Sequence, residues 1–134
     1  MYVSRDGEID IYEPGLKSMV LRNQKNKRLE FSSNIDETVR FSEFIFICVG
    51  TPEEKDGSAD LKFVKSVVDD IASKAVESKV VVIKSTVPPG TANEIQNIFN
   101  NKLRKKNVFV RVASNPEFLR EGSAIKDFLK PDRV

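Results

Sequence analysis

The sequence has a single cysteine, Cys48, so no disulfide bond can form within its 134 residues. One thiol fits a reducing compartment, and we expect a cytoplasmic protein. Long apolar runs are also missing: the longest, at residues 44–49, has six residues, whereas a helix that spans a membrane needs roughly 20. The N-terminal residues lack the apolar core of a signal peptide. We therefore expect no membrane partner.

A large net charge of either sign is absent as well. Lysine and arginine number 22 and aspartate and glutamate number 20, which gives a net charge of +2. So small an excess does not indicate a nucleic-acid partner. The densest basic cluster, KLRKK at residues 102–106, ends a helical pattern, where cations favour the helix C-terminus. We expect a solvated helix end there, no nucleic-acid binding and no metal site.

The sequence does contain a regular alternation of apolar runs and amphipathic stretches, on a scale that suits one domain. Runs at residues 44–49, 79–85 and 108–114 predict strands, the first of them buried on both faces. Apolar residues at helical spacing predict helices at residues 61–75 and 91–103. Ser58 or Asp60 would cap the first helix, and Thr91 with Glu94 would form a capping box at the second. This order predicts an α/β fold, half of a doubly wound parallel sheet.

The first forty residues are less regular. The segment EPGLKSMV, residues 13–20, predicts a short helix with Pro14 at its first position. Residues 28–34 predict a strand, and residues 35–41 predict a short helix that leads into the run at 44–49.

Three polar loops follow the predicted strands, and parallel strands bring such loops to one edge of a sheet, where ligands bind. The third loop places Glu117 and Glu121 four residues apart. Two interpretations are open. The carboxylates serve a ligand site, or they decorate a helix surface, where Glu121 would pair with Lys126 or Arg120 for about 0.3–0.5 kcal/mol.

Four segments favour the first interpretation, because together they resemble the UDP-glucose/GDP-mannose dehydrogenase family. They are IYEPGL at residues 11–16, FICVGTPEEKDGSADL at 46–61, VVIKSTVPPGT at 81–91 and SNPEFLREGSAIKDFLKPDRV at 114–134. The resemblance runs from about residue 7 to residue 134, and it is greatest to the branch that acts on UDP-glucose. It implies an NAD-dependent oxidoreductase that oxidises the C6 alcohol of UDP-glucose to the carboxylate of UDP-glucuronate in two hydride transfers. It also implies a homo-oligomer in the full-length enzyme.

The resemblance also implies roles for individual residues. In the family, an active-site cysteine holds the aldehyde stage as a covalent adduct, and water then hydrolyses the resulting thioester. Glu117 would be the acid/base residue of that hydrolysis, and Thr86 would help to hold the catalytic water. These roles suit a step that removes a proton from water. The implied contacts to the cofactor, NAD, come from Val49, Gly50, Thr51, Pro52, Ser85, Thr86 and Glu121. The implied contacts to the nucleotide sugar come from Glu117, Phe118, Leu119, Arg120 and Glu121.

The sequence departs from the family's pattern at its start. No GxGYVG phosphate loop is present, because the only early glycines are Gly7 and Gly15. We therefore expect a partial Rossmann-type doubly wound parallel sheet that lacks the first βαβ unit. Residues 1–134 would be part of the N-terminal NAD-binding domain, with the central helix and the C-terminal sugar-binding domain absent.

The family's nucleophilic cysteine is expected to lie outside this chain. Cys48 lies within an apolar run without a basic neighbour, so we expect it in the buried core. Two alternatives to UDP-glucose oxidation remain. The parent enzyme could be a GDP-mannose or UDP-N-acetylmannosamine dehydrogenase, or the chain could be a non-catalytic truncated remnant or weak binding module.

Overall fold

A computed structural model describes residue 9 and residues 11–133 of the chain. These residues divide into two compact units. One unit comprises Asn34–Glu117, and the other combines the segment up to Ser33 with the segment from Phe118 onward. Each unit is described below by itself.

The unit Asn34–Glu117 contains a parallel sheet of three strands in the order β1-β2-β3. The strands are β1 (Phe44–Ile47), β2 (Lys79–Ile83) and β3 (Val110–Ser114). Phe44 of β1 is in register with Val80 of β2, which in turn pairs with Arg111 of β3. The predicted α/β fold with a parallel sheet is thus confirmed, although β1 and β2 each end two residues inside the predicted runs and β3 begins two residues inside its run.

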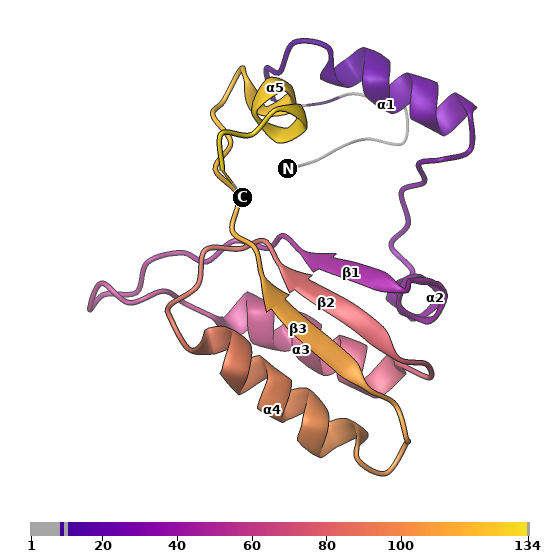
Figure 1. Cartoon of the computed structure of the whole chain (residues 1–134), viewed down its shortest axis with the longest axis vertical. Helices are drawn as coiled ribbons and strands as arrows, with labels where there is room; N and C mark the ends of the chain where they lie inside the picture. The colour runs from indigo at the N-terminus through magenta and orange to yellow at the C-terminus, as the bar shows by residue number, and fades with distance from the viewer. Residues whose placement is uncertain (1–8, 10, 134) are drawn as a thin grey trace. The chain divides into compact units, whose positions relative to one another are not determined.

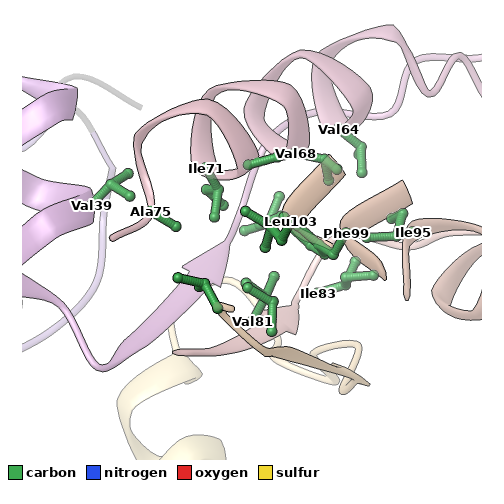
Figure 2. Close-up of a cluster of buried hydrophobic side chains, with 14 residues drawn as sticks. Val39, Val64, Val68, Ile71, Ala75, Val81, Ile83, Ile95, Phe99 and Leu103 are labelled. Atoms are coloured by element: carbon green, nitrogen blue, oxygen red, sulfur yellow. The ribbon is translucent and has the colours of Figure 1, made fainter. Parts of the chain in front are cut away.

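Two helices cover one face of this sheet, α3 (Lys62–Lys74) and α4 (Thr91–Leu103) (Figure 1). Their apolar stripes meet the buried side chains of β2 in a single core, shown in Figure 2. The largest side chains with at most 2% exposure are Phe99, Ile47, Ile71, Ile83, Ile95, Leu103, Val64, Val68 and Val81. Helical spacing in the sequence therefore identified the core-facing stripe correctly, because residues three and four apart lie on one side of a helix.

The prediction that the first strand is buried on both faces was wrong. Ile47 is buried, but Phe44 and Phe46 are each 57% exposed. Side chains alternate between the faces of a sheet, and both phenylalanines lie on the face opposite to Ile47. A continuous apolar run cannot reveal this difference, since it looks the same whether one face or both are covered.

Helix α2 (Ile35–Phe41) begins as the sequence predicts, with Asn34 as its cap. The Asn34 side chain accepts a hydrogen bond from the Glu37 backbone N–H. At its other end, the buried Lys79 side chain donates to the carbonyl oxygens of Arg40 and Ser42, at 3.4 Å and 2.7 Å from Nζ. These bonds explain how a lysine can lie at 4% exposure, because its ammonium group is paired with carbonyls at the helix C-terminus.

The second unit contains α1 (Leu16–Lys25) and α5 (Ala124–Leu129). The predicted N-terminal helix exists, but Pro14 is not its first residue. Gly15 is the N-cap, with a φ of 86°, and α1 begins one residue later. Positive φ is easily adopted by glycine, so the chain turns at residues 14 and 15 before the helix starts.

Two further local predictions were wrong. Residues 28–34 form no strand, and none of them pairs with a strand of the sheet. Thr91 and Glu94 form no capping box, because Gly90 is the N-cap of α4 and no side chain caps that end. Glu94 instead forms an ion pair with Lys65 at 2.9 Å.

At α3, the expected cap is partly confirmed, since an Asp60 carboxylate oxygen accepts a hydrogen bond from the Lys62 backbone N–H.

No helix in the described part of the chain has the length and apolar character needed to cross a membrane.

Candidate functional site at the carboxyl edge of the sheet

The carboxyl ends of the three strands are joined by hydrogen bonds between the loops that follow them. After β2, the Lys84 backbone N–H donates to the Ile47 carbonyl at 2.8 Å. The Ser85 hydroxyl, which is buried, donates to the Val49 carbonyl at 2.7 Å. Ser85 therefore links the loop after β1 to the loop after β2. Its predicted contact with NAD remains a prediction, and its hydroxyl hydrogen is already used within the protein.

The two threonines of the predicted site are also brought together. The Thr51 hydroxyl donates to the Thr86 carbonyl at 3.0 Å. Thr86 itself is an exposed residue at this edge. The bond fixes the loop carrying Thr86 to the loop carrying Thr51. This arrangement places the predicted water-holding hydroxyl on a braced backbone.

Lys84 and Asn115 form a third link, which the sequence did not indicate. The Lys84 ammonium donates to the Asn115 side-chain oxygen at 3.2 Å, and the Asn115 N–H donates to the Ile83 carbonyl at 2.9 Å. Asn115 thereby fixes the start of the segment that reaches Glu117. The only signal in the sequence was position, since Asn115 directly follows one predicted strand and Lys84 lies near the end of another.

Gly50 leaves open space at the end of β1. A Cβ atom built on Gly50 would meet no atom within 4 Å. Its φ does not fall in the left-handed region, so neither strain nor packing within the protein explains a glycine here. The backbone at this position is accessible to close approach by a ligand.

Cys48 is exposed, so the prediction that it belongs to the buried core was wrong. It comes one residue after the end of β1 and is no longer part of the pleated strand. The protein atoms that partly cover its thiol raise the pKa of Cys48, and the Lys84 ammonium opposes that rise. The expectation of no basic neighbour therefore also fails. A thiol with a raised pKa is mostly protonated at neutral pH, which is a poor state for a nucleophile.

Glu117 and Glu121, the two carboxylates of the third loop, do not lie on one helix. Residues 115–120 are irregular, and Glu121 begins a turn that precedes α5. Glu117 is exposed and is the last residue of the unit that holds the sheet, whereas residues 118–121 belong to the second unit. The structure therefore places Val49, Gly50, Thr51, Pro52, Ser85, Thr86 and Glu117 in one unit. The roles assigned to these residues and to Phe118, Leu119, Arg120 and Glu121 remain predictions.

Within the second unit, Arg120 has a defined partner. Its guanidinium donates to both carboxylate oxygens of Asp127, from Nε at 3.0 Å and from Nη2 at 2.7 Å. The Arg120 backbone N–H also donates to Asp127, at 3.1 Å. The alternative interpretation offered Arg120 or Lys126 as a surface partner of Glu121, whereas the Arg120 guanidinium pairs with Asp127. Sequence spacing could not show this, because the intervening chain is a turn and not a helix.

The pairing predicts the behaviour of the second unit in acid. The hydrogen bonds from Arg120 lower the pKa of Asp127 to about 2, from about 3.9 in an unfolded chain. A lowered pKa contributes stability that is present above the unfolded value and is lost as the pH falls through the folded value. We expect the Arg120 contacts to persist to about pH 4 and to open as the pH approaches 2. A carboxyl ¹³C titration of Asp127 with a midpoint near 4 would contradict this.

Comparison with known proteins places this geometry in a family. The model of the UDP-glucose/GDP-mannose dehydrogenase family, NAD binding domain, matches residues 3–134. A UDP-glucose 6-dehydrogenase of Pseudomonas aeruginosa is 49% identical over 133 residues, which are 97% of this chain and 29% of that protein. The chain thus spans less than a third of the length of this curated relative.

Solved structures of Rossmann-like nucleotide-sugar dehydrogenases share the fold. A UDP-glucose dehydrogenase from Pyrobaculum islandicum matches with a TM-score of 0.84 and 43% identity, over 97% of this chain and 31% of that one. A GDP-mannose dehydrogenase from Pseudomonas aeruginosa matches with a TM-score of 0.85 and 36% identity, over 96% of this chain and 32% of that one. The chain therefore belongs to the UDP-glucose/GDP-mannose dehydrogenase family and matches its NAD binding domain.

Proposed function

We propose that this chain provides the NAD-binding part of a UDP-glucose 6-dehydrogenase, which oxidises UDP-glucose to UDP-glucuronate. The observation that carries the choice of substrate is the gradient of similarity. Identity is 49% to a UDP-glucose 6-dehydrogenase and 43% to a UDP-glucose dehydrogenase, but 36% to a GDP-mannose dehydrogenase. In this proposal, the sugar-binding domain and the nucleophilic cysteine come from outside residues 1–134. The enzyme is a cytoplasmic homo-oligomer.

The carboxyl edge of the sheet has features that fit a dinucleotide. Gly50 leaves the backbone at the end of β1 uncovered, which allows a phosphate or ribose to approach closely. Thr51 and Thr86 lie beside each other on braced loops and provide hydroxyl groups at the same edge. Ligands bind at this edge in open parallel sheets. These residues, with Val49, Pro52, Ser85 and Glu121, are proposed to hold NAD, which would accept hydride from C6 of the sugar.

Glu117, an exposed residue, carries a carboxylate that suits the second half of the reaction. Hydrolysis of a thioester to a carboxylic acid requires a base that removes a proton from the attacking water. Glu117 would take that proton, and the Thr86 hydroxyl would orient the water. Cys48, with its raised pKa, is not the nucleophile in this proposal. Residues 118–121 would line the nucleotide-sugar site.

Grafting the chain into two enzymes of one organism tests this proposal. Its residues replace the matching segment of the P. aeruginosa UDP-glucose 6-dehydrogenase and, separately, of the P. aeruginosa GDP-mannose dehydrogenase. We expect the first chimera to reduce NAD with UDP-glucose within roughly tenfold of its host. We expect the second to retain less than about 1% of its host's rate, because a misplaced catalytic group costs on the order of 100-fold.

The two alternatives predict different results. Activity restored only in the GDP-mannose host would favour that branch of the family. No activity in either host, although the chimeras are folded and the hosts' own segments are active after the same cloning, would favour a non-catalytic remnant. Purified chain by itself serves as a blank, and we expect it to form no NADH with UDP-glucose.

A further inference from the structure

One motif remains without a function, IYEPGL at residues 11–16, and the structure connects it to the segment proposed to bind the nucleotide sugar. Both lie in the second unit, although they are more than one hundred residues apart in the sequence. The connection runs through α5. One carboxylate holds the start of α5, and a second carboxylate, on α5 itself, holds Arg120.

The first contact is made by Glu13. Its side-chain oxygen accepts a hydrogen bond from the Ile125 backbone N–H at 3.1 Å. Ile125 is the second residue of α5, whose own N-cap, Ser123, makes no side-chain bond to the helix. The first N–H groups of a helix have no partner within it, so Glu13 provides the cap that α5 otherwise lacks. Six residues are too few for a helix to be stable alone.

The second contact is made by Asp127 in the middle of α5. The carboxylate receives three hydrogen bonds from Arg120, one from its backbone N–H and two from its guanidinium. The carbonyl of Arg120 in turn accepts from the Ser123 N–H at 3.0 Å, which closes a turn. Gly122, with a φ of 76°, makes that turn possible. Arg120 is therefore held at its N–H, its carbonyl and its side chain.

The charge of Arg120 is consequently matched within the protein. Two parallel N–H···O bonds between a guanidinium and a carboxylate are stronger and more directional than a single ion pair. The side chain of Asp127 is only 16% exposed, whereas that of Arg120 is 74% exposed. A nucleotide diphosphate at Arg120 would have to compete with Asp127. The pair is better suited to shape the segment than to attract an anion.

We propose that Glu13 and Asp127 are positioning residues for the nucleotide-sugar segment 118–121. Glu13 fixes the start of α5, and Asp127, which is part of α5, binds Arg120 and so ties the preceding segment to that helix. The assignment of the segment to the nucleotide sugar rests on the proposed function above. The coupling of the two carboxylates to Arg120 does not, and it can be tested separately.

Hydrogen exchange on the complete 134-residue chain tests the coupling. In Asp127→Asn, we expect the Arg120 amide to exchange at least roughly tenfold faster, because its acceptor loses its charge and the guanidinium fork is lost. Glu13→Ala should produce a similar change at Ile125 and a smaller one at Arg120. Glu13→Gln retains an accepting oxygen without its charge, so exchange at Ile125 should fall between that of Glu13→Ala and that of the wild type. Asp132→Asn is the matched control, because it also removes one negative charge near Arg120. The Asp132 carboxylate raises the pKa of Arg120 through its charge alone, and less than Asp127 does.

Kinetics of the UDP-glucose chimera test the positioning role. Asp127→Asn and Glu13→Ala should raise the KM for UDP-glucose roughly 10–150-fold, the range expected when a hydrogen bond to a charged group is lost, and leave the KM for NAD unchanged. Asp127→Glu should recover part of the loss.

Each outcome decides one of the two claims. Unchanged exchange at Arg120 in Asp127→Asn would overturn the coupling. Faster exchange with an unchanged KM for UDP-glucose, or an equal rise in both KM values, would overturn the positioning role. An inactive wild-type chimera would refute the proposed function, and the positioning role with it, while the exchange experiment would still decide the coupling.

Discussion

Glu117→Gln in the UDP-glucose chimera should slow turnover by roughly 10²–10⁴-fold, the usual contribution of a general base. Glutamine has almost the same shape as glutamate, but its amide cannot take a proton from water. In the proposed mechanism, oxidation still proceeds to the thioester and then stops at hydrolysis. We therefore expect a covalent sugar adduct to accumulate, which intact-protein mass spectrometry of the quenched enzyme would detect. Affinity for NAD should change little.

The matched control is Glu77→Gln, an exposed glutamate that precedes the amino end of β2, at the opposite edge of the sheet. It makes the same chemical change in the same unit and should leave turnover unchanged. If Glu117→Gln turned over at a near-normal rate, the carboxylate would be structural. If turnover fell without an adduct, Glu117 would act before the thioester forms, and its assignment to hydrolysis would be wrong.

The part of the fold that follows from periodicity was predictable from the sequence. The apolar runs gave β2 and β3, and the helical spacing gave the buried stripes of α3 and α4. These patterns are reliable because burial on one side of a helix imposes its period on the sequence. Exposure of Phe44 and Phe46 was not predictable, since it depends on whether another layer covers their face. Residues 28–34 show the same limit, because β-like composition forms a strand only beside a partner.

The candidate site was predictable in position but not in its contacts. Polar residues directly after three parallel strands indicate a ligand edge, and the structure joins those loops through Ser85, Thr51 and Lys84. Two of these links join a hydroxyl to a backbone carbonyl, and the third joins the side chains of Lys84 and Asn115. No local pattern in the sequence reveals such partners. Asp127 is a clearer case. Its bonds to Arg120 depend on a turn at Gly122. The two residues are seven apart, and a continuous helix would place them on one face but two turns apart, too far for a direct bond.

Phe99→Ala should destabilise the chain by about 3–5 kcal/mol, the range measured when a fully buried phenylalanine is truncated. Phe99 is 1% exposed and lies on α4 among the side chains of α3 and β2 (Figure 2). Truncation removes the apolar contacts of a whole ring and leaves a cavity that the two helices can only partly close. Since a domain's total stability is about 5–15 kcal/mol, we expect the midpoint of urea unfolding, followed by circular dichroism, to fall severely.

Phe109→Ala provides the comparison that separates burial from composition. Phe109 is 65% exposed, and its hydrogen bonds are made by its backbone. Its N–H donates to the Ser78 hydroxyl, and its carbonyl accepts from the Lys79 N–H. Alanine retains both bonds, so the loss should stay within about 0.5 kcal/mol. The same atoms are removed in the two variants, and only their surroundings differ. Equal shifts in the unfolding midpoint would mean that the cluster around Phe99 is not the packed core, because a packed interior cannot lose a ring as cheaply as a surface can.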